Sequence, residues 1–192
     1  MMSAPNINLG EILTIIGEAG KRLDEIGSNE GASGNISVCI RGSLNPMPTF
    51  PIAQGFQLPY PVPELSGATI LVSGSGTRLR EIAEEPTANI ACIVIMAGGN
   101  TGTIFTSPHC HFKRVTSEFN SHLAVHQKQM ASPDNEFNAV IHAQPFYLTF
   151  LSHITHYQNY SYLNTHLLRW QPETILQFSE GLGVIPFEIP GS

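Results

Sequence analysis

The sequence predicts a mixed α/β fold, with a largely antiparallel central sheet and helices on both faces. Two observations lead to this prediction. An amphipathic helical pattern opens the chain, and short β-rich segments then mix with further helical patterns. These segments do not follow a regular strand–helix–strand rhythm, which favours antiparallel pairing over a parallel sheet. The chain has 192 residues, enough for one domain and few for two, so we expect a single domain over residues 1–192.

Residues 8–26 form the clearest expected helix, because apolar side chains recur there at spacings of three and four residues. Asn8 and Glu11 have the spacing of a capping box, in which each side chain accepts a hydrogen bond from the other's backbone N–H. Gly27 follows the last apolar residue and ends the helix. Further helices are expected over residues 117–130, 145–157 and 172–178.

The expected strands are short and rich in apolar residues. They are residues 36–41, 68–72, 90–96, 103–106, 137–142 and 184–189. Residues 42–67 contain six prolines, which a helix does not tolerate, so we expect a long loop there. The loop also contains Phe50, Phe56 and Tyr60, and these aromatic side chains favour an ordered, packed segment over a disordered linker.

Charge and composition exclude several partners. The net charge is −6 and no cluster of Lys and Arg is visible, which argues against nucleic acid as the main partner. The longest apolar run, residues 90–97, is too short to span a bilayer, and the first residues lack the pattern of a secretory signal. Three cysteines without metal-type spacing are typical of free thiols in a reducing compartment. We therefore expect a cytoplasmic protein without a membrane partner.

Two turns carry small and hydroxylated residues of the kind that bind phosphate. Residues 33–35 end in Asn35, a side-chain donor, and residues 73–76 read Ser-Gly-Ser-Gly after an apolar strand. Backbone N–H groups and hydroxyls at such turns can converge on an anion. Each turn taken alone is more often only a turn.

Two later patches carry residues with acid–base or ligand chemistry. Thr116, Ser117 and Glu118 open a helix, where free N–H groups and the helix dipole favour an anion. A plain N-cap explains the same residue types. His142 and Gln144 lie two residues apart on a strand and so point to the same side. A single strand histidine is usually structural, and glutamine is a poor ligand for a transition metal.

In their order along the chain, these patches resemble the class II aldolase/adducin family, and within it the bacterial rhamnulose-1-phosphate aldolases. The resemblance runs from the first helix to the C-terminus. The matching segments are residues 34–37, 71–76, 86–89, 116–118 with His122, 140–144, 180–187 and 190–191. No single segment decides the match, which depends on their order and spacing.

The resemblance implies a lyase that cleaves a ketose 1-phosphate reversibly into dihydroxyacetone phosphate and an aldehyde. It implies that Glu118 is the acid/base that moves a proton at the carbon of the enediolate. A zinc ion held by three histidines, of which His142 matches the first, would polarise the ketose carbonyl. The residues expected to hold the phosphate are Asn35, Ser75, Gly76, Thr116 and Ser117. The resemblance also implies a homo-oligomer, a tetramer.

The sequence departs from the family pattern at the metal site. Gln144 stands in the place of the second histidine, and the chain ends before the position of the third. We therefore expect a C-terminally truncated member of the family with one of its three metal ligands. A catalytic zinc normally has three protein ligands, so weak or absent zinc binding is expected. The remaining histidine pairs are His109 with His111, His122 with His126, and His153 with His156.

Three functions follow from these patterns. The first is a class II aldolase with a phosphate pocket faced by Glu118. The second is a non-catalytic, adducin-like module for binding or assembly, which the missing ligands favour and the retained Glu118 disfavours. The third is a metal hydrolase that uses His109, His111 and His142, which requires those three side chains to converge.

Overall fold

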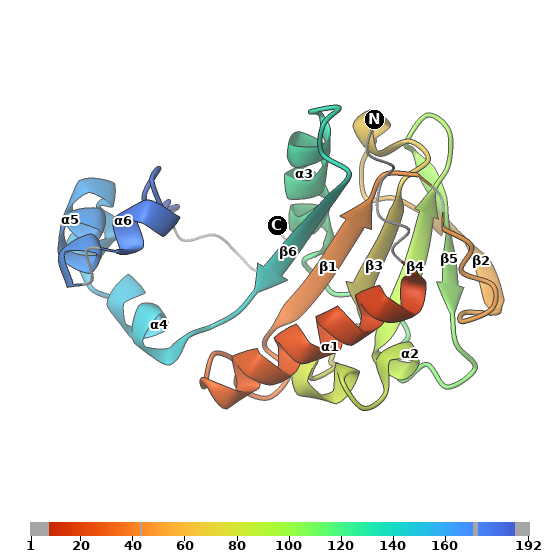
Figure 1. Ribbon diagram of the computed structural model, residues 1–192, viewed down its shortest axis with the longest axis horizontal. Helices are drawn as coiled ribbons and strands as arrows, with labels where there is room; N and C mark the ends of the chain where they lie inside the picture. The colour runs from red at the N-terminus through yellow and green to blue at the C-terminus, as the bar shows by residue number, and fades with distance from the viewer. Residues whose placement is uncertain (1–7, 43, 171–172, 187–192) are drawn as a thin grey trace. The chain divides into compact units, whose positions relative to one another are not determined.

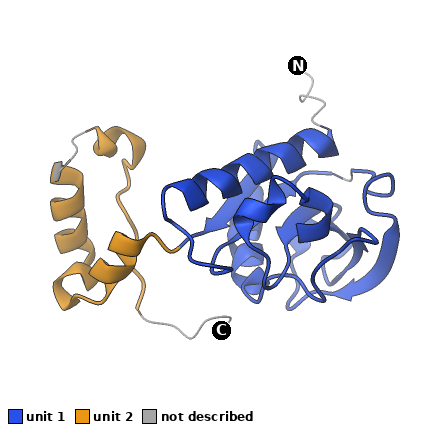
Figure 2. Ribbon diagram, turned by 90° about the horizontal axis from the view of Figure 1, so that it is seen from below, with its two compact units in different colours: residues 1–143, 191 blue, residues 144–190, 192 orange. Residues whose placement is uncertain are grey.

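The computed structural model in Figure 1 describes residues 8–42, 44–170 and 173–186. Its contacts divide the chain into two compact units (Figure 2). Unit 1 comprises residues 1–143 and unit 2 comprises residues 144–190. The single domain expected over residues 1–192 stays a prediction. Within the described residues, none of the helices combines the length and apolar character needed to cross a bilayer.

Unit 1 is built on a six-stranded sheet in the order β2-β5-β4-β3-β1-β6. Every neighbouring pair of strands is antiparallel. In chain order the strands are β1 (Asn35–Ile40), β2 (Ile52–Gln57), β3 (Thr69–Ser73), β4 (Ile90–Ile95), β5 (Thr101–Thr106) and β6 (Phe137–His142). The predicted α/β fold with a largely antiparallel sheet is thus confirmed.

Helix α1 (Leu9–Glu25) covers one face of this sheet (Figure 1). The predicted capping box is present, since the Asn8 side chain accepts from the Glu11 N–H at 2.9 Å and the Glu11 carboxylate accepts from the Asn8 N–H at 3.2 Å. Buried apolar residues of α1 form one core cluster with residues of β1, β3 and β4 on the same face. The members of this cluster are Ile12, Leu13, Ile16, Ile36, Phe50, Leu71, Leu79, Ile82, Ile90 and Cys92.

Helix α3 (Phe119–Met130) packs on the opposite face, so helices lie on both faces as predicted. Alternate residues of β3 and β4 point to this side because successive strand residues face opposite ways. Among them, Ile70 and Ile93 join Phe119 and Leu123 of α3 in the second core cluster. Short elements close the edges of unit 1, namely η1 (Pro63–Leu65), η2 (Leu79–Ile82) and α2 (Pro86–Asn89).

Strand β2 is the main element that the sequence did not predict. The expected loop over residues 42–67 contains it, paired antiparallel with β5 at the edge of the sheet. Five of its six residues are exposed, so the alternation of apolar and polar residues that marks a half-buried strand is missing. Prolines on either side, Pro51 and Pro59, also masked it. The five earlier expected strands match β1, β3, β4, β5 and β6 to within two residues.

Unit 2 consists of short helices and connecting turns. They are α4 (Phe146–Ser152), η3 (Thr155–Gln158), α5 (Tyr160–Trp170) and α6 (Thr174–Gln177). The helix expected over residues 145–157 ends early, at Ser152, and a 3₁₀ turn follows. Helix α5 was not expected, whereas α6 lies within the expected helix 172–178. Of the last expected strand, residues 184–186 are irregular and residues 187–189 lie outside the described residues.

Candidate functional site

Three of the predicted site residues meet at the end of the β1–β6 pair. The antiparallel register places Asn35 directly opposite His142, so both side chains point to the face covered by α3. Glu118 is the N-cap residue of α3. Its Oε2 lies 2.6 Å from His142 Nδ1, and the Asn35 amide lies 3.1 Å from the same nitrogen. A half-buried carboxylate is therefore bonded directly to the predicted ligand histidine.

The phosphate-type turns are joined to this site by backbone hydrogen bonds. The Ser73 carbonyl accepts from the Thr116 N–H at 3.0 Å, and the Ser75 N–H donates to the Arg114 carbonyl at 2.9 Å. The Ser73 hydroxyl accepts from the Ile36 N–H at 3.1 Å. Segments far apart in the sequence, residues 35–36, 73–75 and 114–116, thus lie side by side.

The five residues expected to hold phosphate differ in exposure. Asn35 and Thr116 are buried, Ser75 is half-buried, and Gly76 and Ser117 are exposed. Gly76 has a φ of +80°, a conformation that favours glycine, in the turn after β3. The Thr116 hydroxyl accepts from the Glu118 N–H at 3.3 Å. Their roles in phosphate binding stay predictions.

A line of buried polar side chains leads away from Asn35 between α3 and the sheet. His122 Nε2 lies 2.5 Å from Asn35 Oδ1, and His122 Nδ1 lies 2.6 Å from Ser37 Oγ. Ser37 Oγ also lies 2.7 Å from His126 Nε2, and His126 Nδ1 lies 2.9 Å from Asn138 Oδ1. We call this set the polar relay. Its members, in order, are Glu118, His142, Asn35, His122, Ser37, His126 and Asn138.

Burial governs the charge of the two relay histidines. Loss of water around the ring, with smaller contributions from nearby His126 and His142, lowers the pKa of His122 from 6.5 to about 4. Burial likewise lowers the pKa of His126 to about 4, against an opposing hydrogen bond from Asn138. Both rings are neutral at pH 7.

The sequence did not identify Ser37 and Asn138 as members of this site. A signal was present for Ser37, since it lies two residues after Asn35 and so faces the same side of β1. The pair His122 and His126 was considered as a place for a metal. The structure differs, because both ring nitrogens of each histidine already have hydrogen-bonding partners.

The described side chains do not fit a zinc site with three ligands. Across residues 8–42, 44–170 and 173–186, no group of three His, Cys, Asp or Glu side chains is placed to hold a metal ion. His109, His111 and His142 therefore do not converge, which overturns the geometry that the metal-hydrolase hypothesis requires. His142 offers one imidazole, and its Nδ1 is bonded to Glu118. Gln144 lies beyond the end of β6 and belongs to unit 2.

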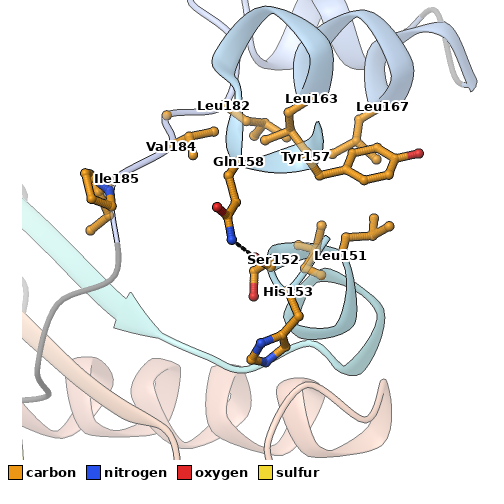
Figure 3. A pocket seen from close by; sticks show the side chains of 13 residues that line it. Leu151, Ser152, His153, Tyr157, Gln158, Leu163, Leu167, Leu182, Val184 and Ile185 are labelled. Carbon is orange, nitrogen blue, oxygen red and sulfur yellow. Dashed lines mark hydrogen bonds between the residues drawn. The ribbon is translucent and has the colours of Figure 1, made fainter. Parts of the chain in front are cut away.

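Unit 2 contains a separate, largely apolar hollow of about 820 Å³. Leucines from α4 and α5 line it together with Tyr157, Val184 and Ile185, as Figure 3 shows. The Gln158 side chain crosses its rim and donates to the Ser152 carbonyl at 2.9 Å. None of the predicted site residues lines this hollow.

Comparisons with known proteins find relatives over most of the chain. The family described as Class II Aldolase and Adducin N-terminal domain matches residues 15–192. A rhamnulose-1-phosphate aldolase from Yersinia pestis (strain Pestoides F) is 29% identical over 143 residues, covering 71% of this chain and 49% of the relative. One from Bacteroides thetaiotaomicron is 28% identical over 142 residues, covering 74% of this chain and 51% of the relative.

A solved structure shows the same fold. The crystal structure of a sugar-phosphate aldolase from Thermotoga maritima superimposes with a TM-score of 0.77 at 26% identity, covering 96% of this chain and 73% of that one. The chain spans about half the length of the curated relatives described above. The family match extends over nearly all of unit 1 and into unit 2. The chain belongs to the class II aldolase and adducin family.

Proposed function

We propose that this chain carries the acid–base and phosphate-binding part of an aldolase that cleaves a ketose 1-phosphate, of the rhamnulose 1-phosphate type, into dihydroxyacetone phosphate and an aldehyde. The observation that carries the proposal is the contact between the Glu118 carboxylate and His142 Nδ1 at 2.6 Å, beside the buried Asn35. The aldolase relatives support the substrate class.

Glu118 is the residue that moves the proton. Cleavage breaks the bond between carbons 3 and 4 of the ketose. The hydroxyl on carbon 4 loses its proton and becomes the aldehyde carbonyl, and the bond electrons stay on the other fragment as an enediolate that needs a proton at carbon 3. The Glu118 carboxylic acid delivers this proton, and its carboxylate removes the same proton in the condensation direction. The carboxylate is half-buried, so substrate can reach it, and its contact with His142 fixes its orientation.

The phosphate occupies the N-terminal end of α3 and the turn after β3. Thr116, Ser117 and Ser75 supply hydroxyl groups there, because the N–H groups of Thr116 and Ser75 are already bonded to backbone carbonyls. Gly76 supplies an N–H without a side chain to block the approach. The positive end of the helix dipole adds a favourable field, because α3 extends over 12 residues. No lysine or arginine is required for an anion bound in this way.

Zinc, when bound in an aldolase of this type, polarises the ketose carbonyl. Among the described residues, no three His, Cys, Asp or Glu side chains are placed to hold the ion, and the roles proposed for Glu118 and the phosphate-binding residues do not include it. Replacing Gln144→His alone leaves the ligand set short of three, and we expect this variant to gain little zinc affinity and little cleavage. Zinc content per chain and the rate of cleavage, both measured before and after replacement, check this expectation.

The decisive experiment measures cleavage of rhamnulose 1-phosphate by the purified chain, with and without added zinc, alongside the metal content. Release of dihydroxyacetone phosphate is followed by a coupled reduction. We expect cleavage that falls about 10²–10⁴-fold in Glu118→Gln, the usual range for a general acid–base group. Glu64→Gln, an exposed carboxylate on η1, is the matched control and keeps its rate. A folded, zinc-supplemented chain without cleavage overturns the proposal.

A non-catalytic, adducin-like binding module is the second candidate, which the incomplete ligand set favours. It predicts that dihydroxyacetone phosphate or inorganic phosphate binds at Thr116 and Ser75 without any turnover. Calorimetric titration with each ligand, repeated on Thr116→Val, distinguishes a binding module from an enzyme. Light scattering of the same samples tests the expected homo-oligomer.

A further inference from the structure

The polar relay follows a simple geometric rule. Glu118, His122 and His126 lie four residues apart on one side of α3, so they are stacked one turn above another. Opposite them, Asn35 and Ser37 of β1 lie two residues apart and therefore point to the same face of the sheet. Asn138 and His142 of β6, four residues apart, point to this face as well. Each helix residue therefore meets strand residues at its own level.

Each contact of the relay requires one hydrogen between its two atoms, which fixes the direction of every bond. A carboxylate oxygen accepts, so His142 Nδ1, 2.6 Å from Glu118 Oε2, carries a hydrogen. The Asn35 atom 3.1 Å from that nitrogen must then be an acceptor, which is the amide oxygen. A 180° rotation of the Asn35 amide brings the oxygen there and moves no other residue.

The same rotation determines the remaining bonds. The Asn35 amide nitrogen now faces His122 Nε2 and donates to it, so neutral His122 carries its hydrogen on Nδ1. That N–H donates to Ser37 Oγ at 2.6 Å, and the Ser37 hydroxyl donates to His126 Nε2 at 2.7 Å. Neutral His126 then has its hydrogen on Nδ1 and donates to Asn138 Oδ1 at 2.9 Å.

The opposite orientation of the Asn35 amide creates a conflict at the Glu118 end of the relay. Its nitrogen would face the His142 Nδ1–H, placing two donors together. Its oxygen would also require a hydrogen on His122 Nε2, which reverses the bonds through Ser37 and requires the Asn138 amide to rotate as well, so that its nitrogen faces His126 Nδ1. Buried groups without a matching partner are costly, so a single direction satisfies every contact.

We propose that His122, Ser37 and His126 are positioning residues that hold the Asn35 amide oxygen against His142 Nδ1–H and thereby fix the His142 tautomer. The consequence lies at the reacting end, since a hydrogen on Nδ1 leaves the lone pair on His142 Nε2. This inference rests on the proposed function for its catalytic meaning, although the direction of the bonds does not depend on any activity.

The test is a long-range ¹H–¹⁵N NMR experiment on the uniformly labelled chain at pH 7.5, which distinguishes the two neutral tautomers of histidine. We expect His122, His126 and His142 all to carry their hydrogen on Nδ1. A hydrogen on Nε2 of His122 or His126 overturns the proposal without any variant being made. Each ring is assigned by replacing that histidine with Gln in turn.

Ser37→Ala removes the middle of the relay and tests its action at a distance. We expect the single His142 tautomer to be replaced by a mixture, and kcat for rhamnulose 1-phosphate to fall about tenfold while KM changes less than twofold. Thr69→Val is the matched control, because Thr69 is also a buried hydroxyl on a strand, bonded to Gly42 and Leu44 away from the site. It should change stability but leave the His142 tautomer as it was.

The proposed function and the proposed bond directions of the relay can be overturned separately. Three Nδ1–H tautomers in a chain that cleaves no ketose 1-phosphate overturn the proposed function and leave the relay standing. Cleavage by a chain whose His122 carries its hydrogen on Nε2 overturns the relay and leaves the function standing. An unchanged His142 tautomer in folded Ser37→Ala overturns the positioning role.

Discussion

The two units bury their apolar side chains very differently. In unit 1, the sheet has a helix on each face, and apolar residues from strands and helices form two buried clusters. In unit 2, Asn164 is the one residue that is buried among those the structure describes. Large apolar side chains there remain exposed, including Phe146, Leu176 and Ile185. A sheet covered by a helix on each face buries many apolar side chains, which a few short helices do not.

In unit 2, where few side chains are buried, side-chain hydrogen bonds hold segments of the chain together. The Asn164 side chain donates to the carbonyls of Tyr160 and Leu182, both at 2.9 Å, and accepts from the Leu182 N–H at 2.6 Å. In unit 1, by contrast, the buried polar residues of the relay converge on Glu118 and His142. Buried apolar clusters and the candidate site thus both lie in unit 1, whereas unit 2 presents apolar surface.

The largest expected effect comes from truncating the unit 1 core. Leu71 on β3 is fully buried, at 0% exposed, and Leu176 on α6 is 85% exposed. We expect Leu71→Ala to lower the free energy of unfolding by about 2–5 kcal/mol, because it removes buried contacts and leaves a cavity. The matched variant Leu176→Ala should change it by less than about 0.5 kcal/mol. Urea denaturation followed by circular dichroism measures both, and equal losses would contradict the contrast between the units.

Acid should destabilise unit 1 through the relay histidines. Their pKa is about 4 in the folded chain and 6.5 when water surrounds the ring. The unfolded chain therefore binds more protons between these values, so the stabilisation is complete above pH 6.5 and is lost as pH falls toward 4. From pH 7.5 to pH 5, we expect the free energy of unfolding to fall by on the order of 2–4 kcal/mol for the two rings together.

The variant His126→Gln separates the contribution of one histidine to this pH dependence. His126→Gln keeps an amide near the position of Nε2, where it can bond Ser37, and removes one titrating ring. We expect about half the pH dependence to remain in urea titrations of this variant. A stability that is flat from pH 7.5 to pH 5 in the unaltered chain would mean that water reaches both rings.

The sequence predicted the parts of the fold in which local pattern and packing agree. Helix α1 carries its apolar stripe and its capping box in the sequence, and both are seen in the structure. Strand β4 was visible because nearly all of its residues are buried and β-branched or small. Strand β2 was not, because its residues are mostly exposed and its pairing with β5 depends on backbone bonds that no side-chain pattern reports.

The candidate site likewise has a part that the sequence predicted and a part that it did not. Glu118, Asn35 and His142 were found through short motifs, and the structure brings them together. The relay beyond Asn35 was not found, because Ser37 and Asn138 become neighbours of His122 and His126 only when β1, β6 and α3 pack. Spacing of two on a strand and four on a helix gives each row of residues, but only tertiary packing sets one row against the other.

Close backbone packing in unit 1 predicts an intermediate effect. A Cβ added at Gly20 on α1 would lie 2.2 Å from the Leu79 carbonyl oxygen of η2, which is too close for any real contact. We expect Gly20→Ala to cost about 1–3 kcal/mol, since the helix must shift from η2. Gly183→Ala in unit 2 meets nothing within 4 Å and is the matched control. Thermal unfolding of both variants checks this. A Gly20→Ala variant as stable as the unaltered chain would show that α1 can move away from η2 at little cost.

The smallest effect on unit 1 is expected from Asn164→Ala, which should loosen unit 2 alone. The variant loses all three side-chain bonds of Asn164, so the Leu182 amide should exchange its hydrogen about tenfold faster, a change of about 1.4 kcal/mol. Amides of β3 should exchange as before. Asn159→Ala is the matched control, because the Asn159 side chain accepts only from the Tyr162 N–H among the bonds described here, away from Leu182. If β3 amides also exchanged faster in Asn164→Ala, the units would share their stability, and the contrast between them would describe burial but not independence.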